Sequence, residues 1–130
     1  TVDGEQIDLS KTYTYRGVCL SGVPNLATIF GYVNASWTLR ADLISTYVCR
    51  LLNHMEAIGA SQCTPTITPE DLEREARPFI EGFSLGYLRR AFSILPKQGH
   101  RAPWRNPQNL AEDRKALERD PVDDGVMRFG

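Results

Sequence analysis

Residues 22–40, GVPNLATIFGYVNASWTLR, predict a strand, a tight loop and the start of a helix in direct succession. The apolar run at residues 26–30 ends at Gly31 and has the length and composition of a strand buried on both faces. Ser36 is a good N-cap for the helix that follows. The free N–H groups and the positive end of the helix dipole favour an anionic or electron-rich ligand atom there. The alternative is a strand-loop-helix unit without any ligand, which is common in proteins that mix helices and strands.

After Ser36, apolar residues recur at steps of three and four, which is the spacing of one face of a helix. They are Trp37, Ala41, Ile44, Val48, Leu51, Met55 and Ile58. We therefore expect a helix over residues 37–58 that packs this stripe into the core, with Gly59 as its C-terminal stop.

Shorter elements are expected on both sides of this helix. Asp3-Gly4 predicts a hairpin turn, and residues 12–20 predict a small ribbon with a break at Gly17. Because only two residues precede that turn, we expect the chain to be a piece of a longer one. The predicted class is α+β, mostly helical, with a small N-terminal ribbon, a long central helix and three shorter helices.

The three shorter helices have separate signals. Thr68 is a candidate N-cap followed by Pro69, and this pair predicts a short helix to about Ala76. A second helix is expected over residues 85–95, and a third is expected from Asn106-Pro107 to about residue 119. Trp104 is expected to pack in the core, and residues 126–129 predict an edge strand.

Composition excludes several classes of protein. The chain has 130 residues and a formal net charge of -1, which is ordinary for a globular protein and predicts no particular partner. Cys19, Cys49 and Cys63 are odd in number and lack Cys-x-x-Cys spacing, so neither a disulfide framework nor a zinc site is expected. They are expected to be reduced, with Cys19 and Cys49 acting as small buried apolar residues in a cytoplasmic protein. No long apolar run or leader is present, so we expect no membrane span and no signal peptide.

A basic and aromatic segment between Arg89 and Arg105 has two possible interpretations. It forms a solvated face paired with the acids at 70–75 and 112–120, or it binds phosphate-bearing or acidic partners. Nucleic acid is not expected as a partner, because the neighbouring acids cancel the charge.

His54 and His100 have no ligand partners at metal-site spacing, so no metal is expected and His54 is interpreted as an exposed helix residue. Glycine fingerprints, a P-loop and a recognisable Ser-His-acid set are absent from the sequence, so we do not expect the chain by itself to be a complete enzyme.

Three segments resemble the carboxy-terminal part of flavin-containing monooxygenases of the Baeyer-Villiger type. They are YRGVCLSGVPNLATIFGYVNASWTLR at 15–40, PFIEGFSLGY at 78–87 and LPKQGHRAPWR at 95–105. The resemblance covers nearly the whole chain in the same order. It implies a parent enzyme that uses FAD and NADPH to insert oxygen beside a ketone or to oxidise a sulfur centre. It also implies that residues 1–59 end the FAD-binding domain and that residues 60–130 form a helical tail on it.

The same resemblance implies a role for the loop at residues 31–35. It would pass beside the flavin ring, and Asn34, Ala35, Ser36 and Trp37 would contact the cofactor, while no catalytic residue is implied in this chain. The partners implied are the remainder of the flavoprotein and a small ketone or sulfide. The isolated chain is expected to be inactive, to retain no cofactor and to associate with itself through uncovered apolar surface. The alternative is an interaction module that acts through the basic segment.

Overall fold

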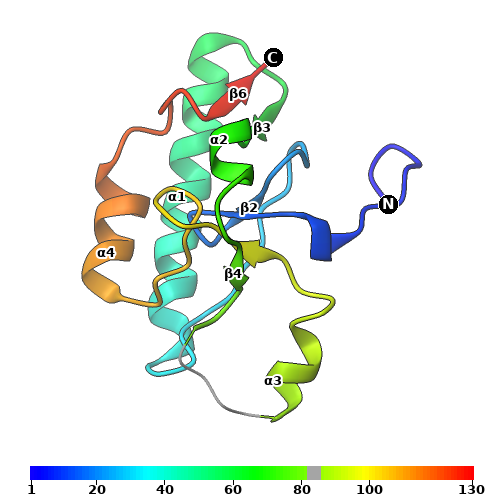
Figure 1. Ribbon diagram of the computed structural model, residues 1–130. Coiled ribbons are helices and arrows are strands. Elements are labelled where there is room, and N and C mark those ends of the chain that lie inside the picture. Colours follow the sequence, from blue (N-terminus) through cyan, green and yellow to red (C-terminus); the bar gives the residue numbers. More distant parts are fainter. Residues whose placement is uncertain (82–85) are drawn as a thin grey trace.

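The computed structural model describes residues 1–81 and 86–130, and only the backbone of residues 87–89. A long helix, α1 (Trp37–Ile58), runs through the molecule, and the short elements pack around it (Figure 1). The mixed α+β class with more helix than strand is confirmed. The other elements are a 3-10 turn η1 (Leu9–Lys11), β1 (Thr14–Tyr15), β2 (Cys19–Leu20), β3 (Cys63–Pro65), α2 (Pro69–Leu72), β4 (Arg77–Pro78), α3 (Gly86–Ala91), β5 (Lys97–Gln98), α4 (Leu110–Arg114), a π-helical turn η2 (Lys115–Arg119) and β6 (Met127–Phe129).

Both predicted ends of α1 are confirmed, but the buried face differs from the predicted stripe. Gly59 adopts the left-handed conformation that ends a helix, with φ 70°, and its N–H donates to the Glu56 carbonyl. The centre of the stripe is buried, whereas Trp37 and Ile58 at its two ends are 48% and 52% exposed. The buried residues are Arg40, Leu43, Ile44, Tyr47, Leu51 and Met55. Apolar spacing therefore located the helix, while the neighbouring elements decided which residues are covered.

The strands form three antiparallel pairs of two strands each. β1 and β2 form the expected N-terminal ribbon, and Arg16 and Gly17 occupy the turn with φ of 54° and 66°. The turn predicted at Asp3-Gly4 is also confirmed, because Val2 and Glu5 pair across it. β3 pairs with β6 and β4 pairs with β5. The predicted strand at the end of the chain is β6, whereas β3 lies in a segment for which no strand was predicted.

The strand predicted at residues 26–30 is wrong. This segment has no ladder partner among the described residues, and its Leu26 and Ile29 side chains are 36% and 59% exposed. Thr28 connects the segment to the ribbon, because the Thr28 N–H and hydroxyl both donate to the Val18 carbonyl at 2.8 Å. A strand buried on both faces needs neighbours at both edges, and the described chain supplies none.

The three short helices differ from their predicted bounds. The Thr68 side chain accepts from the Asp71 N–H as predicted, but α2 ends at Leu72 rather than Ala76. α3 is shorter than predicted, and residue 85 lies outside the described residues. The cap of α4 is Asn109, whose side chain accepts from the Glu112 N–H. Asn106, the predicted cap, is buried instead and donates to the Phe79 carbonyl at 3.0 Å.

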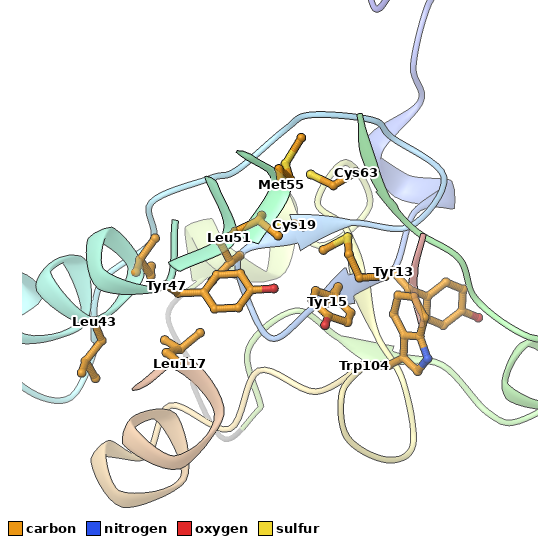
Figure 2. Packing of buried hydrophobic residues seen from close by; sticks show 13 residues of the cluster. Tyr13, Tyr15, Cys19, Leu43, Tyr47, Leu51, Met55, Cys63, Trp104 and Leu117 are labelled. Carbon is orange, nitrogen blue, oxygen red and sulfur yellow. The ribbon is translucent and has the colours of Figure 1, made fainter. Parts of the chain in front are cut away.

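The core lies between α1, the ribbon, the loop that carries Trp104 and the turn η2 (Figure 2). Trp104 is 1% exposed and meets Tyr15 edge to face, with ring centroids 5.7 Å apart, so its predicted packing role is confirmed. Cys19 is buried as predicted. Burial raises the pKa of its thiol to about 12; the nearby Cys63 adds to this increase, and Arg16 opposes it. Cys49 is exposed, which contradicts its predicted burial.

Two further observations concern the long helix. His54 is half-buried and packs edge to face on Phe129, with ring centroids 4.9 Å apart, so the prediction of an exposed histidine is wrong. Strand β6 covers the His54 side chain. The position of β6 depends on its pairing with β3, so the local sequence of α1 carries no signal for this contact. Among the described elements, no helix has both the length and the apolar character needed to cross a membrane.

Candidate functional site

The four predicted cofactor-contacting residues lie at the start of α1, at the opposite end of that helix from β3 and β6 (Figure 1). Asn34, Ala35, Ser36 and Trp37 are all exposed. Ser36 occupies the N-cap position as predicted, but its side chain caps no backbone N–H. Its Oγ atom lies 3.0 Å from the Thr38 hydroxyl instead. The first turn of α1 therefore presents backbone N–H groups that the Ser36 side chain leaves open.

The approach to this helix start depends on close aromatic packing. The rings of Phe30 and Trp37 have centroids 5.1 Å apart, and Phe30 also meets Phe79 edge to face. Gly31 passes against the indole of Trp37 so closely that a Cβ at this position would overlap the ring and the Trp37 carbonyl. A glycine is therefore required at the point where the loop begins.

Arg40 fixes the loop from its buried side. Its side chain is fully buried, and its guanidinium donates to the Phe30 carbonyl at 2.6 Å. It also donates to the carbonyls of Arg16 and Gly17 at 3.2 and 3.3 Å, and to Asp113 Oδ2 at 3.3 Å. Several acceptors and one carboxylate thus compensate a charge that burial would otherwise strongly disfavour.

Residues from the C-terminal part of the chain hold the next three positions of the loop. The Tyr32 hydroxyl donates to Asp113 Oδ2 at 2.6 Å, and burial together with this carboxylate raises the pKa of Tyr32. The Gln108 side chain accepts from the Val33 N–H at 3.0 Å and donates to the Gly31 carbonyl at 3.2 Å. The loop is therefore fixed on its inner side, while residues 34–37 face outward.

Sequence reasoning did not identify this supporting network. Arg40 carries one usable signal, because it interrupts the apolar face of α1 three residues after Trp37 and four before Ile44. Gln108 and Asp113 carry none, because they lie more than 70 residues beyond the loop and only the fold brings them to it.

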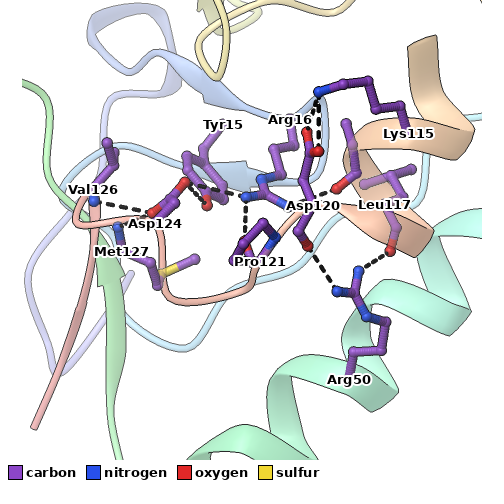
Figure 3. A network of polar contacts seen from close by, with 11 residues as sticks. Tyr15, Arg16, Arg50, Lys115, Leu117, Asp120, Pro121, Asp124, Val126 and Met127 are labelled. Carbon is purple, nitrogen blue, oxygen red and sulfur yellow. Dashed lines mark hydrogen bonds and ion pairs between the residues drawn. The ribbon is translucent and has the colours of Figure 1, made fainter.

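A second concave region lies between residues 100–107 and the α4–η2 segment, with a volume of ≈ 690 Å³. Arg16 lies at its base and donates to the carbonyls of Ala116 and Pro121 at 2.6 and 2.7 Å, and to Asp124 at 3.2 Å (Figure 3). Arg50 of α1 donates to the carbonyls of Leu117 and Asp120, both at 2.7 Å. Two arginines thus satisfy the carbonyl groups at the end of η2, where a helix has no partners of its own.

The basic segment is partly neutralised in the way that the solvated-face interpretation predicts. Arg101 bonds to Asp71 at 2.9 Å and lies 3.8 Å from Glu70, both in the acidic stretch that precedes it. The side chains of residues 87–89, including Arg89, lie outside those described. Within the part of the chain that the structure covers, no group of three His, Cys, Asp or Glu side chains is placed to hold a metal ion.

Comparison with known proteins gives relatives with a consistent description. The chain is 47% identical over 129 residues to the FAD-containing monooxygenase EthA of Mycobacterium tuberculosis, and 46% identical over 129 residues to EthA of Mycolicibacterium smegmatis. It is 43% identical over 129 residues to a protein of Acinetobacter baylyi named "Probable FAD-binding monooxygenase AlmA". Each match takes in 99% of this chain and 26% of the relative.

The resemblance inferred from the sequence is therefore confirmed, and the chain spans about a quarter of the length of the curated relatives it matches. No protein-family model matches the chain. No solved structure matches it either.

Proposed function

We propose that this chain is part of a monooxygenase that uses FAD and NADPH, and that it completes the flavin site of that enzyme. The observation that carries the proposal is the 47% identity over 129 residues to a protein named as an FAD-containing monooxygenase. NADPH, and the choice between oxygen insertion beside a ketone and oxidation of a sulfur centre, come from the family resemblance. The substrate in this proposal is a small ketone or sulfide.

The start of α1 fits one edge of a flavin ring. Open N–H groups and the positive end of a helix dipole favour the electron-rich atoms of the pyrimidine side. Trp37, at 48% exposure, offers an apolar surface beside them. When bound, FAD supplies the transfer of electrons from NADPH to O2 and of one oxygen atom to the substrate. Residues Asn34, Ala35, Ser36 and Trp37 bind and orient the ring and stabilise negative charge on it.

The remainder of the polypeptide is the main partner in this proposal. Residues 1–59 end an FAD-binding domain and residues 60–130 pack on it, in keeping with the contacts of α1 with α4 and η2. The exposed Leu26 and Ile29 side chains fit a surface that the rest of the protein covers. The isolated chain would then have no activity and no bound cofactor. Three free cysteines fit a reducing, cytoplasmic setting.

The test is a pair of substitutions on α1 in the full-length protein, Trp37→Ala and Leu52→Ala. Both side chains are exposed, at 48% and 57%, but Leu52 lies about four turns from the loop. Loss of the indole should raise the dissociation constant for FAD roughly fivefold to tenfold, because an aromatic contact contributes about 1 kcal/mol. Leu52→Ala should leave it unchanged. Titration of the apoprotein with FAD, followed by flavin fluorescence, measures both values. Equal affinities in the two variants would refute the assigned contact.

A further inference from the structure

We propose that Gln108 is a positioning residue for the flavin site and that it holds the loop in the geometry that the ring requires. This inference rests on the proposed function. Gln108 itself does not contact the cofactor in this proposal. It acts through the backbone of Gly31 and Val33, two residues that immediately precede the exposed positions 34–37.

The first observation is the pairing of one amide side chain with two alternate residues of the loop. Gln108 Oε1 accepts from the Val33 N–H at 3.0 Å, and Gln108 Nε2 donates to the Gly31 carbonyl at 3.2 Å. A neighbouring β-strand would satisfy one donor and one acceptor in the same way. The side chain thus replaces a strand partner for a segment that has none in the described chain.

The second observation is the backbone conformation of Gln108. Its φ is 53°, in the left-handed region that is uncommon for a residue with a Cβ. Such a conformation persists only where surrounding contacts determine it, and it is enriched at binding sites. Here the two hydrogen bonds to the loop accompany this conformation. Gln108 also stands directly before Asn109, the cap of α4, so the loop and this helix are fixed to each other.

The third observation is a second attachment at Tyr32, between the two residues that Gln108 holds. The Tyr32 hydroxyl and Arg40 Nε both bond to the same oxygen of Asp113, a residue of α4 that is 1% exposed. Three consecutive loop residues are therefore fixed to the start of the α4 region. The exposed residues 34–37 follow directly after these three restrained positions. The outward face of the loop is therefore organised before any ligand binds.

The test compares Gln108→Gly with Asn25→Gly in the full-length protein. Asn25 is a close match for Gln108: its φ is 54°, its Nδ2 donates to the Ser61 carbonyl at 3.1 Å, and its Oδ1 accepts from the Cys63 N–H at 2.9 Å. Those partners follow the C-terminal end of α1, away from the flavin site. Glycine relieves the backbone strain at both positions and removes one amide side chain from each.

Hydrogen exchange of the apoprotein and FAD affinity are measured for both variants. Gln108→Gly should speed exchange of the Val33 amide and of residues 34–37, and should raise the dissociation constant for FAD about tenfold. It should also alter the visible absorption band of the bound flavin, which loss of stability alone does not change. Asn25→Gly should speed exchange of the Cys63 amide and leave FAD affinity and the flavin spectrum unchanged.

Two results would overturn the inference while leaving the proposed function intact. One is unchanged exchange at Val33 in Gln108→Gly. The other is faster exchange at Val33 with the affinity and spectrum of the wild type, which would show that the ring does not depend on this restraint. A wild-type full-length protein that binds no FAD refutes the proposed function itself, so the two failures are distinguishable.

Discussion

Three arginines carry much of the specific structure of this chain, and each one ends on backbone carbonyl groups. Arg16, Arg40 and Arg50 donate to carbonyls that lie at least ten residues away. A guanidinium has several donors in a fixed plane, so it can satisfy carbonyls that belong to different segments at once. In this molecule the long-range placement of loops therefore depends on charged residues, not only on apolar packing.

Asp124 makes the stability of this network depend on pH. Burial acts to raise its pKa, but the Tyr15 hydroxyl, the N–H groups of Met127 and Val126, and Arg16 together hold it below the ordinary value of 3.8. A carboxyl whose folded pKa is lowered contributes stability that is present above its unfolded pKa and is lost as the pH falls through the folded pKa. Asp124→Asn should therefore lower the thermal unfolding midpoint at pH 6, and the difference from wild type should shrink below about pH 4. Asp123→Asn, an exposed neighbour, is the control, and identical pH profiles for the two variants would contradict the assignment.

At the scale of elements, α4 and η2 are too short to be stable alone and depend on what their ends contact. Asn109 caps the start of α4, while Arg16 and Arg50 bond to the carbonyls near the end of η2. Leu117 is the fully buried side chain through which η2 packs on α1. Short helices of this kind gain their stability from such tertiary contacts rather than from helix propensity.

Arg50→Met tests the contribution of these bonds. The substitution keeps an unbranched apolar stem but removes both donors to the Leu117 and Asp120 carbonyls. We expect a loss of about 2 kcal/mol in the free energy of unfolding, because hydrogen bonds from charged groups are worth more than neutral ones. Arg119→Met is the control, since Arg119 is an exposed residue of η2. Urea unfolding of the 130-residue chain, followed by circular dichroism, measures both, and equal losses would argue against the role given to Arg50.

At the scale of the whole molecule, the described chain leaves several large apolar side chains exposed before and within the start of α1. Ile29, Trp37 and Leu39 are 59%, 48% and 43% exposed. Exposed apolar side chains of this kind can meet another protein surface. In the intact protein we assign that surface to the rest of the polypeptide, since this chain spans only 26% of the length of the relative from Mycobacterium tuberculosis.

The isolated chain should associate with itself through this surface. Ile29→Glu places a charge at the most exposed of these three side chains and should shift the chain towards monomer, whereas Ile94→Glu should not, although Ile94 is 67% exposed. Ile94 follows α3, a different element of the fold. Sedimentation equilibrium over a range of concentrations measures the average mass. A wild-type chain that stays monomeric at high concentration would contradict this prediction.

The sequence by itself determined the features that depend on local chemistry. The bounds of α1 follow from 22 residues of helical spacing and from the glycine that ends them, and the turns at Gly4 and Gly17 follow from the conformations that glycine permits. The resemblance to flavin-containing monooxygenases also came from the order of residues along the chain, and the four exposed positions at the start of α1 remain a prediction from that resemblance.

Only the tertiary structure decided which residues are covered and which support the loop. The run at 26–30 has the composition of a buried strand, yet it is exposed because burial requires partners that the described chain does not contain. Gln108, Asp113 and Arg40 are polar residues with no local pattern in common, and they meet the loop only because α4 folds back against α1. Local sequence records backbone preference, whereas contacts between distant segments depend on the whole fold, and this is why the residues that support the loop were not predictable from the sequence.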